Sequence, residues 1–160
     1  MIFGLQKPTT MDIQTPEILV QKQRIKIFLV DDDPLYLRLL ESHFTENSAM
    51  DVTSFITGEA CLRQLEQKPD IIVLDYFLNG MDKSAKDGLA ILIKIKQEHP
   101  DIQVIMLSSH ENVEIALNCI SNNAFNFIVK NDTTFLRLKH SIKQIFHQYS
   151  KVKELVVWDW

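Results

Sequence analysis

The sequence predicts an α/β fold in which a parallel sheet of five strands is covered by helices on both faces. Short apolar runs alternate with segments of helical periodicity five times along the chain. The apolar runs are continuous, as expected for parallel strands that are buried on both faces. Because such alternation also implies right-handed crossovers, we expect a doubly wound, three-layer sandwich.

The elements are expected in strict βα order. The strand runs lie at 25–30, 50–55, 69–75, 102–109 and 125–130. Apolar residues at helical spacing predict helices over 34–44, 57–67, 87–100, 111–123 and 134–146. Pro34 is acceptable in a first helical turn, Thr57 suits an N-cap, and Pro100 stops the third helix. The second strand ends at Phe55 without a chemically active side chain, so we place it at the edge.

Composition favours one domain with modest tails. The chain has 160 residues, of which 46% are hydrophobic and 24% charged, enough for a single core. The net charge of −4 and the lack of a basic run argue against direct nucleic-acid binding. No apolar run approaches the ~18 residues of a membrane span, and the N-terminus does not resemble a secretory signal. Cys61 and Cys119 lie in helical segments and are expected to be buried free thiols of a cytoplasmic protein.

Reactive side chains stand at the carboxyl ends of the strands, where doubly wound sheets bind their ligands. They are Asp31, Asp32 and Asp33 after the first strand, Asp75 after the third, Ser108 after the fourth and Lys130 after the fifth. Clustered carboxylates repel one another unless a cation is present. The sequence therefore predicts a metal site at this edge of the sheet.

Five motifs, in order, carry a resemblance to a known family. LVDDDP, PDIIVLDYFLNGMD, DGLAIL, QVIMLSS and AFNFIVK resemble the receiver domain of bacterial two-component response regulators, the CheY-like family. The likeness runs from about Lys26 to Phe146. It implies a flavodoxin-like sheet with strand order 2-1-3-4-5. We accordingly expect an N-terminal extension over 1–24, a receiver domain over 25–146 and a helical tail over 147–160.

The resemblance implies that Asp75 accepts a phosphoryl group from a phosphohistidine on a sensor kinase. It also implies that Asp31 and Asp32 hold Mg²⁺ together with Asp75 and the backbone carbonyl of Phe77. Elementary chemistry agrees, since Mg²⁺ prefers oxygen ligands and commonly combines a few carboxylates with phosphate oxygens. Phosphoryl transfer needs positioning and neutralisation of charge more than covalent chemistry.

Further roles follow from the same resemblance. Ser108 and Lys130 are expected to stabilise the phosphoryl group, and Ser108 with Phe127 to form the conformational switch. Asp33 falls one residue beyond the acidic pair, where it is either solvated or close to the first helix N-terminus. His110 either faces the phosphoryl site or is an exposed loop histidine.

The sequence departs from the family at three places. Asn131 follows Lys130 where the family usually has a cis proline, so the geometry of this loop is open. Asn79 stands where proline is common, four residues after Asp75. The segment KSAKD, 83–87, lengthens the loop beside the site.

We expect a phosphoacceptor switch that acts without an attached output domain, because only ~14 residues follow the last helix. Its partners would be a sensor histidine kinase or phosphotransfer protein and a downstream protein. Its own chemistry would be limited to self-phosphotransfer and autodephosphorylation. One alternative is an interaction module that has lost phosphorylation. Another is an aspartyl-phosphate hydrolase, which Phe77 disfavours because it offers no general acid.

A heptad stripe predicts that the last helix continues beyond the domain. It comprises Phe135, Leu138, Ile142, Ile145, Tyr149, Val152 and Val156. Its first half must pack against the sheet. The apolar side chains of its second half and the two tryptophans of VVWDW must be buried against something else. We expect self-association or partner binding through residues 142–156, or an intramolecular cover by residues 13–20.

Overall fold

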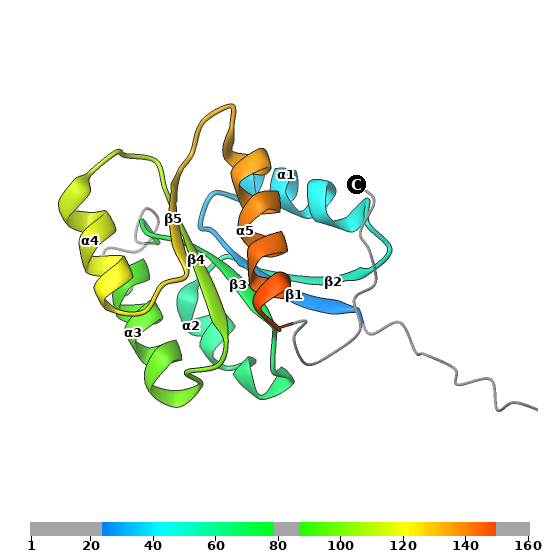
Figure 1. The fold of residues 1–160 in the computed structure, drawn as a ribbon, viewed down its shortest axis with the longest axis horizontal. Helices are drawn as coiled ribbons and strands as arrows, with labels where there is room; N and C mark the ends of the chain where they lie inside the picture. Colours follow the sequence, from blue (N-terminus) through cyan, green and yellow to red (C-terminus); the bar gives the residue numbers. More distant parts are fainter. Residues whose placement is uncertain (1–23, 79–86, 150–160) are drawn as a thin grey trace, which may run out of the picture.

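A five-stranded parallel sheet forms the central layer of the fold (Figure 1). A computed structural model describes residues 24–78 and 87–149. The strands are β1 (Ile25–Val30), β2 (Met50–Phe55), β3 (Ile71–Asp75), β4 (Gln103–Ser108) and β5 (Asn126–Val129). Their order is β2-β1-β3-β4-β5, and each neighbouring pair is parallel. The predicted fold class and strand order are therefore confirmed, with β2 at an edge.

Within the described ranges, five α-helices cover the sheet. They are α1 (Pro34–Thr45), α2 (Gly58–Leu62), α3 (Gly88–Glu98), α4 (Val113–Ser121) and α5 (Thr134–Tyr149). Helices α1 and α5 pack on one face, and α2, α3 and α4 on the other (Figure 1). Helix α5 runs three residues beyond the expected end at Phe146.

The prediction of one helix over 57–67 was wrong in its second half. Thr57 caps α2 as expected, with its hydroxyl accepting a hydrogen bond from the backbone N–H of Ala60 at 3.2 Å. After Leu62 the chain leaves the α-helix and forms a single 3₁₀ turn, η1 (Leu65–Gln67). Lys68 then adopts a left-handed conformation with φ of 52°. A residue before proline disfavours the α region, so Pro69 explains why the helix cannot continue there.

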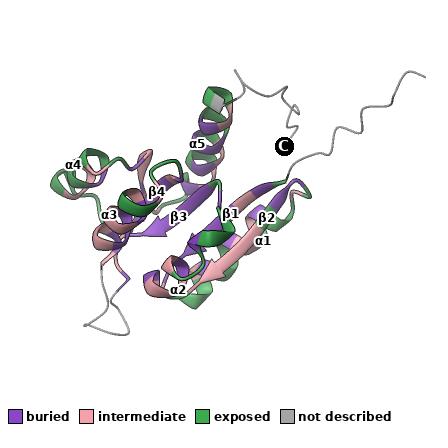
Figure 2. Cartoon of the chain, turned by 90° about the horizontal axis from the view of Figure 1, so that it is seen from below, coloured by how far each residue is buried: buried purple, intermediate pink, exposed green. Residues whose placement is uncertain are grey.

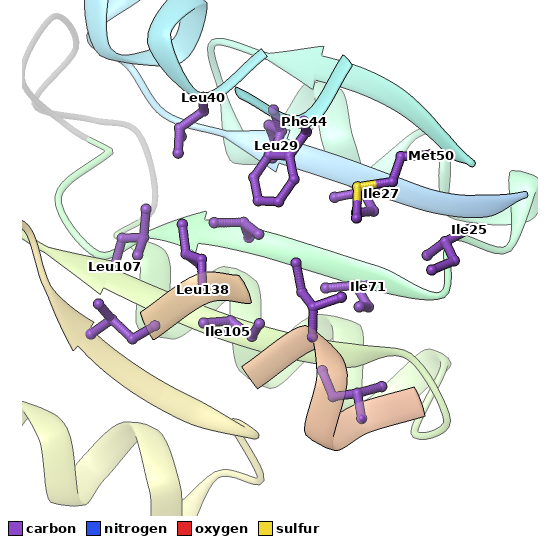
Figure 3. Close-up of a cluster of buried hydrophobic side chains, with 14 of the residues drawn as sticks. Ile25, Ile27, Leu29, Leu40, Phe44, Met50, Ile71, Ile105, Leu107 and Leu138 are labelled. Atoms are coloured by element: carbon purple, nitrogen blue, oxygen red, sulfur yellow. The ribbon is translucent and has the colours of Figure 1, made fainter. Parts of the chain in front are cut away.

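Two apolar layers separate the sheet from its helices. The layer under α1 and α5, here called the α1/α5 core, contains alternate strand residues and the inward face of both helices (Figure 3). The opposite layer contains the remaining strand residues with those of α2, α3 and α4. β3 is buried throughout and β1 at every position except Lys26, while β2 is partly exposed, as Figure 2 shows.

The structure also bears on the predicted heptad stripe and on the two cysteines. Leu138, Ile142 and Ile145 are buried against the sheet, so the first half of the heptad stripe does cover it. Cys61 and Cys119 are buried free thiols. Predictions about residues 1–23, 79–86 and 150–160 concern parts of the chain outside the described residues. Among the helices that are described, none combines the length and apolar character needed to cross a membrane.

Candidate phosphoryl-acceptor site

Sheet register brings the predicted site residues together at the carboxyl edge. Val30 pairs with Leu74 across β1 and β3, so the next residue of each strand, Asp31 and Asp75, lies at the same edge. Ser108 is the last residue of β4, directly after the pairing partner of Asp75. Lys130 follows β5, and its backbone N–H donates to the Ser108 carbonyl at 2.8 Å. Strand order and register alone therefore assemble this site.

Three carboxylates form a tight cluster. Asp31, Asp32 and Asp75 each offer a ligand atom, and these atoms lie within 4.8 Å of one another. Asp31 and Asp75 are only 1% and 2% exposed, so little water screens their charges. Asp33 does not join the cluster. It is exposed, and its Oδ1 accepts hydrogen bonds from the backbone N–H groups of Leu35 and Tyr36 as the N-cap of α1.

Lys130 supplies the positive charge within the cluster. Its Nζ lies 2.6 Å from Asp31 Oδ2, to which it donates a hydrogen bond, and 2.7 Å from Asp75 Oδ1. The second contact is a close ion pair, and no described group other than Lys130 donates a hydrogen bond to Asp75 Oδ1. The side chain of Lys130 is 16% exposed, so both pairs are shielded from solvent.

The electrostatics indicate that one lysine does not balance the site. Burial raises the pKa of Asp75 to about 6, against the lowering effect of Lys130. Burial also raises the pKa of Asp31, again opposed by Lys130. At Lys130 burial acts to lower the pKa, but Asp75 and Asp31 outweigh it and raise the pKa above its ordinary 10.5. The ammonium therefore stays charged at neutral pH, while the carboxylates remain short of positive charge.

These features fit a bound divalent cation. Three carboxylates converge on one ammonium, and no described group other than Lys130 serves the buried Oδ1 of Asp75. Hard cations such as Mg²⁺ prefer oxygen ligands of this kind. The backbone N–H of Phe77 hydrogen-bonds to the Asp75 carboxylate and lowers its pKa, so the Phe77 backbone lies at the cluster. The role of its carbonyl as a metal ligand stays a prediction.

Ser108 ends β4 and Phe127 lies within β5, and neither belongs to the carboxylate cluster. The Ser108 hydroxyl donates to the backbone carbonyl of His110 at 2.9 Å and accepts from the His110 backbone N–H at 3.2 Å. It is thus engaged with its own loop. Phe127 is partly buried and packs against the core on the side of α2, α3 and α4.

His110 lies at the rim of the site. It is exposed, in agreement with the alternative of an exposed loop histidine. Its ring also contacts the ring of Phe77, with centroids 5.2 Å apart. Phe77 makes a second edge contact with Tyr76 at 4.9 Å. An aromatic row therefore flanks Asp75.

The loop after Lys130 has a trans peptide bond, since none of the described residues follows a cis bond. Asn131 donates its backbone N–H to Thr134 Oγ1 at 2.7 Å, and its Oδ1 accepts from the backbone N–H of Thr133. Side-chain hydrogen bonds thus hold the turn where the family usually has proline.

Two residues at the site were missed by reasoning from sequence. The ring of Tyr36 lies under Lys130, with Nζ 4.3 Å from its centroid. Its partner lies almost a hundred residues further along the chain, so no local pattern in the sequence signals the contact. Gly88 begins α3 against the backbone of β3. A Cβ there would meet the Asp75 carbonyl oxygen and lie 2.7 Å from Tyr76 Cα.

Comparison with known proteins agrees with this fold. The family model described as response regulator receiver domain matches residues 27–142. The chain belongs to this family, the receiver domains of response regulators in two-component signalling.

Its relatives include much longer regulators. The nitrogen assimilation regulatory protein NtrX of Azorhizobium caulinodans is 37% identical over 109 residues, covering 65% of this chain and 22% of that protein. The DNA-binding transcriptional regulator NtrC of Klebsiella pneumoniae is 34% identical over 109 residues, covering 68% of this chain and 22% of that protein. The chain thus spans about a fifth of the length of these curated relatives.

Solved structures give the same result. The receiver domain of NtrX from Brucella abortus superimposes with a TM-score of 0.64 at 29% identity, covering 76% of this chain and 98% of that chain. The BeF3-activated receiver domain of DrrB superimposes with a TM-score of 0.67 at 26% identity, covering 78% and 99%.

Proposed function

We propose that this receiver domain is a phosphoacceptor switch in which Asp75 takes a phosphoryl group from a phosphohistidine. The donor would be a sensor histidine kinase or a phosphotransfer protein. One observation carries the proposal. Asp75 is a nearly fully buried carboxylate at the end of β3, 2.7 Å from the ammonium of Lys130 and adjacent to two further carboxylates.

Asp31, Asp32, Asp75 and the carbonyl of Phe77 would hold Mg²⁺ in this role. The shortage of positive charge at the cluster supports this assignment. When bound, Mg²⁺ would neutralise carboxylate charge and attract phosphoryl oxygens.

The residues of the chain would divide the transfer as follows. A carboxylate oxygen of Asp75 attacks phosphorus, and the P–N bond to the donor imidazole breaks. Lys130, already paired with Asp75, offsets the negative charge of the incoming phosphoryl oxygens. Water later breaks the acyl phosphate, regenerating Asp75 and releasing phosphate. Phe77 offers no group that activates this water, so autodephosphorylation is slow.

Ser108 and Phe127 would convert phosphorylation into a change of surface. To reach a phosphoryl oxygen, the Ser108 hydroxyl has to leave its hydrogen bonds with His110. Movement at the end of β4 makes room for Phe127, which lies on the neighbouring strand beside Met106. The switch is then a two-state element biased by local charge.

A downstream protein would bind the face formed by α4, β5 and α5. Helix α4 exposes three large apolar side chains there, Val113 at 73%, Leu117 at 62% and Ile120 at 47%. Apolar side chains exposed at helical spacing are typical of a protein-binding surface. The acidic net charge of −4 supports a protein rather than nucleic acid as the direct partner.

Self-association through the last helix stays a prediction. Ile142 and Ile145 are buried within the domain, so an interface would use the helix beyond them. Light scattering of the full chain and of a chain ending at Phe146, with and without beryllofluoride, tests this. The cytoplasmic location likewise stays a prediction, which the buried free thiols support.

Beryllofluoride binding tests the proposed site. With Mg²⁺ present, this phosphoryl mimic should bind the wild-type chain and shift the amide resonances of Ser108 and Phe127. Asp75→Asn should bind none, because the mimic needs the carboxylate oxygen. Equal binding to the Asn variant would refute the assignment of Asp75.

A further inference from the structure

Lys130 is held by more than its carboxylate partners. The flexible four-carbon stem of a lysine can adopt many rotamers, so two ion pairs at one end do not by themselves fix it. The aromatic ring of Tyr36 lies beneath the same ammonium, 4.3 Å from Nζ. Tyr36 belongs to α1, whereas Asp31 and Asp75 stand at the ends of β1 and β3. The ring therefore contacts Nζ from a different element than either carboxylate does.

Tyr36 itself is firmly placed. Its backbone N–H donates to Oδ1 of Asp33, the N-cap of α1, at 3.3 Å. Its side chain packs against the α1/α5 core. Burial raises the pKa of the Tyr36 hydroxyl, while the Thr134 hydroxyl and then Lys130 oppose that change. The hydroxyl end of the ring therefore lies close to Thr134.

Thr134 connects the ring to the loop that carries Lys130. It is fully buried at the start of α5, and its Oγ1 accepts the backbone N–H of Asn131 at 2.7 Å. The same hydroxyl donates to the carbonyl of Val129 at 3.4 Å. The residues on both sides of Lys130 are thus bound to Thr134, which faces Tyr36.

We propose that Tyr36 is a positioning residue for Lys130, its ring holding the ammonium at the carboxylate cluster in the orientation that phosphoryl transfer requires. This inference rests on the function proposed above. A ring face attracts a cation through its quadrupole, more strongly where water is excluded, and Lys130 is only 16% exposed. The contact also narrows the rotamers open to the lysine before the phosphoryl group arrives.

Labelling by acetyl phosphate at saturating Mg²⁺ separates this role from simple packing. Tyr36→Leu, which removes the ring, should slow labelling of Asp75 by about ten-fold. The change should fall on the maximal rate more than on the KM for acetyl phosphate, and Mg²⁺ affinity should stay close to wild type. Tyr36→Phe keeps the ring and should label at nearly the wild-type rate. Leu39→Ala, an exposed change on the same helix, is the matched control and should have no effect.

A double-mutant cycle with Lys130→Met supplies a second readout that does not need labelling. The free energy of unfolding should fall less on Tyr36→Leu in the Lys130→Met background than in wild type, because the contact is already lost. Equal losses in both backgrounds, or wild-type labelling by Tyr36→Leu, would overturn the inference, as would equal slowing by the Phe and Leu variants. If wild type takes no label on Asp75, the proposed function fails instead, and the cycle still decides whether Tyr36 acts on Lys130.

Discussion

Lys130 Nζ lies 2.7 Å from Asp75 Oδ1, although the two residues end strands that β4 separates in the sheet. The long lysine side chain spans the intervening strand end and reaches Asp31 as well. This geometry places one charge among three carboxylates.

Asp75→Asn should stabilise the metal-free protein at neutral pH. Because folding raises the pKa of Asp75 from 3.8 to about 6, the folded state holds this proton more tightly than the unfolded state. The contribution of Asp75 to the free energy of unfolding is therefore most favourable below pH 3.8 and is lost as pH rises to about 6. This difference in pKa corresponds to roughly 3 kcal/mol. That value is the upper limit for the increase in the free energy of unfolding that Asp75→Asn can give. Urea unfolding in EDTA at pH 4.5 and 7.5 measures it, and a gain that does not grow with pH would contradict the account.

Asp32→Ala should lower Mg²⁺ affinity by more than about ten-fold, since it removes one of three clustered carboxylates. Asp33→Ala is the matched control. It removes the N-cap of α1 and should cost ~1 kcal/mol of stability while leaving Mg²⁺ affinity unchanged. Calorimetric titration compares the two variants. Similar affinities in both would mean that the cluster is not the metal site.

Phe77→Glu should shorten the lifetime of the phosphorylated domain. The Phe77 ring contacts the ring of His110, and the Phe77 backbone N–H hydrogen-bonds to the Asp75 carboxylate. A carboxylate at position 77 would therefore be close enough to the acyl phosphate to activate water. Phe77→Asn should act in the same direction. Decay of the labelled domain after removal of the donor gives the rate, with Phe55→Leu at the sheet edge as control. Slower decay in the two polar variants would refute the shielding role of Phe77.

Gly88→Ala should be more destabilising than Gly58→Ala. At Gly88 the added methyl meets the backbone of Asp75 and Tyr76, which cannot move without displacing β3. At Gly58 it meets side-chain atoms of Ile91 and Leu78, which can shift at lower cost than the backbone of a central strand. We expect a cost of about 1–3 kcal/mol at Gly88 and less at Gly58, measured by thermal or urea unfolding. The reverse order would argue against the close approach of α3 to the site.

Much of the fold could be predicted because each signal was local. Parallel strands buried on both faces appear as apolar runs, and all five were found. The break after Leu62 was missed because it depends on the conformations of Gln64 and Lys68 before Pro69, which apolar spacing does not reveal.

The site was only partly accessible to sequence reasoning. Aspartates at strand ends could be assigned to one edge once parallel order was inferred. Three adjacent aspartates look alike in sequence, however, and only the structure separates Asp33, which caps α1, from Asp31 and Asp32. The contact of Tyr36 with Lys130 joins α1 to the end of β5, and no local pattern encodes such a pairing.

The central claim is that Asp75 is the phosphoacceptor, and peptide mass spectrometry after treatment with acetyl phosphate tests it most directly. With Mg²⁺, the account predicts one phosphoryl group on the peptide that contains Asp75, none after addition of EDTA, and none in Asp75→Asn. Undiminished labelling of Asp75→Asn, or a label on another residue of the wild-type chain, would contradict it.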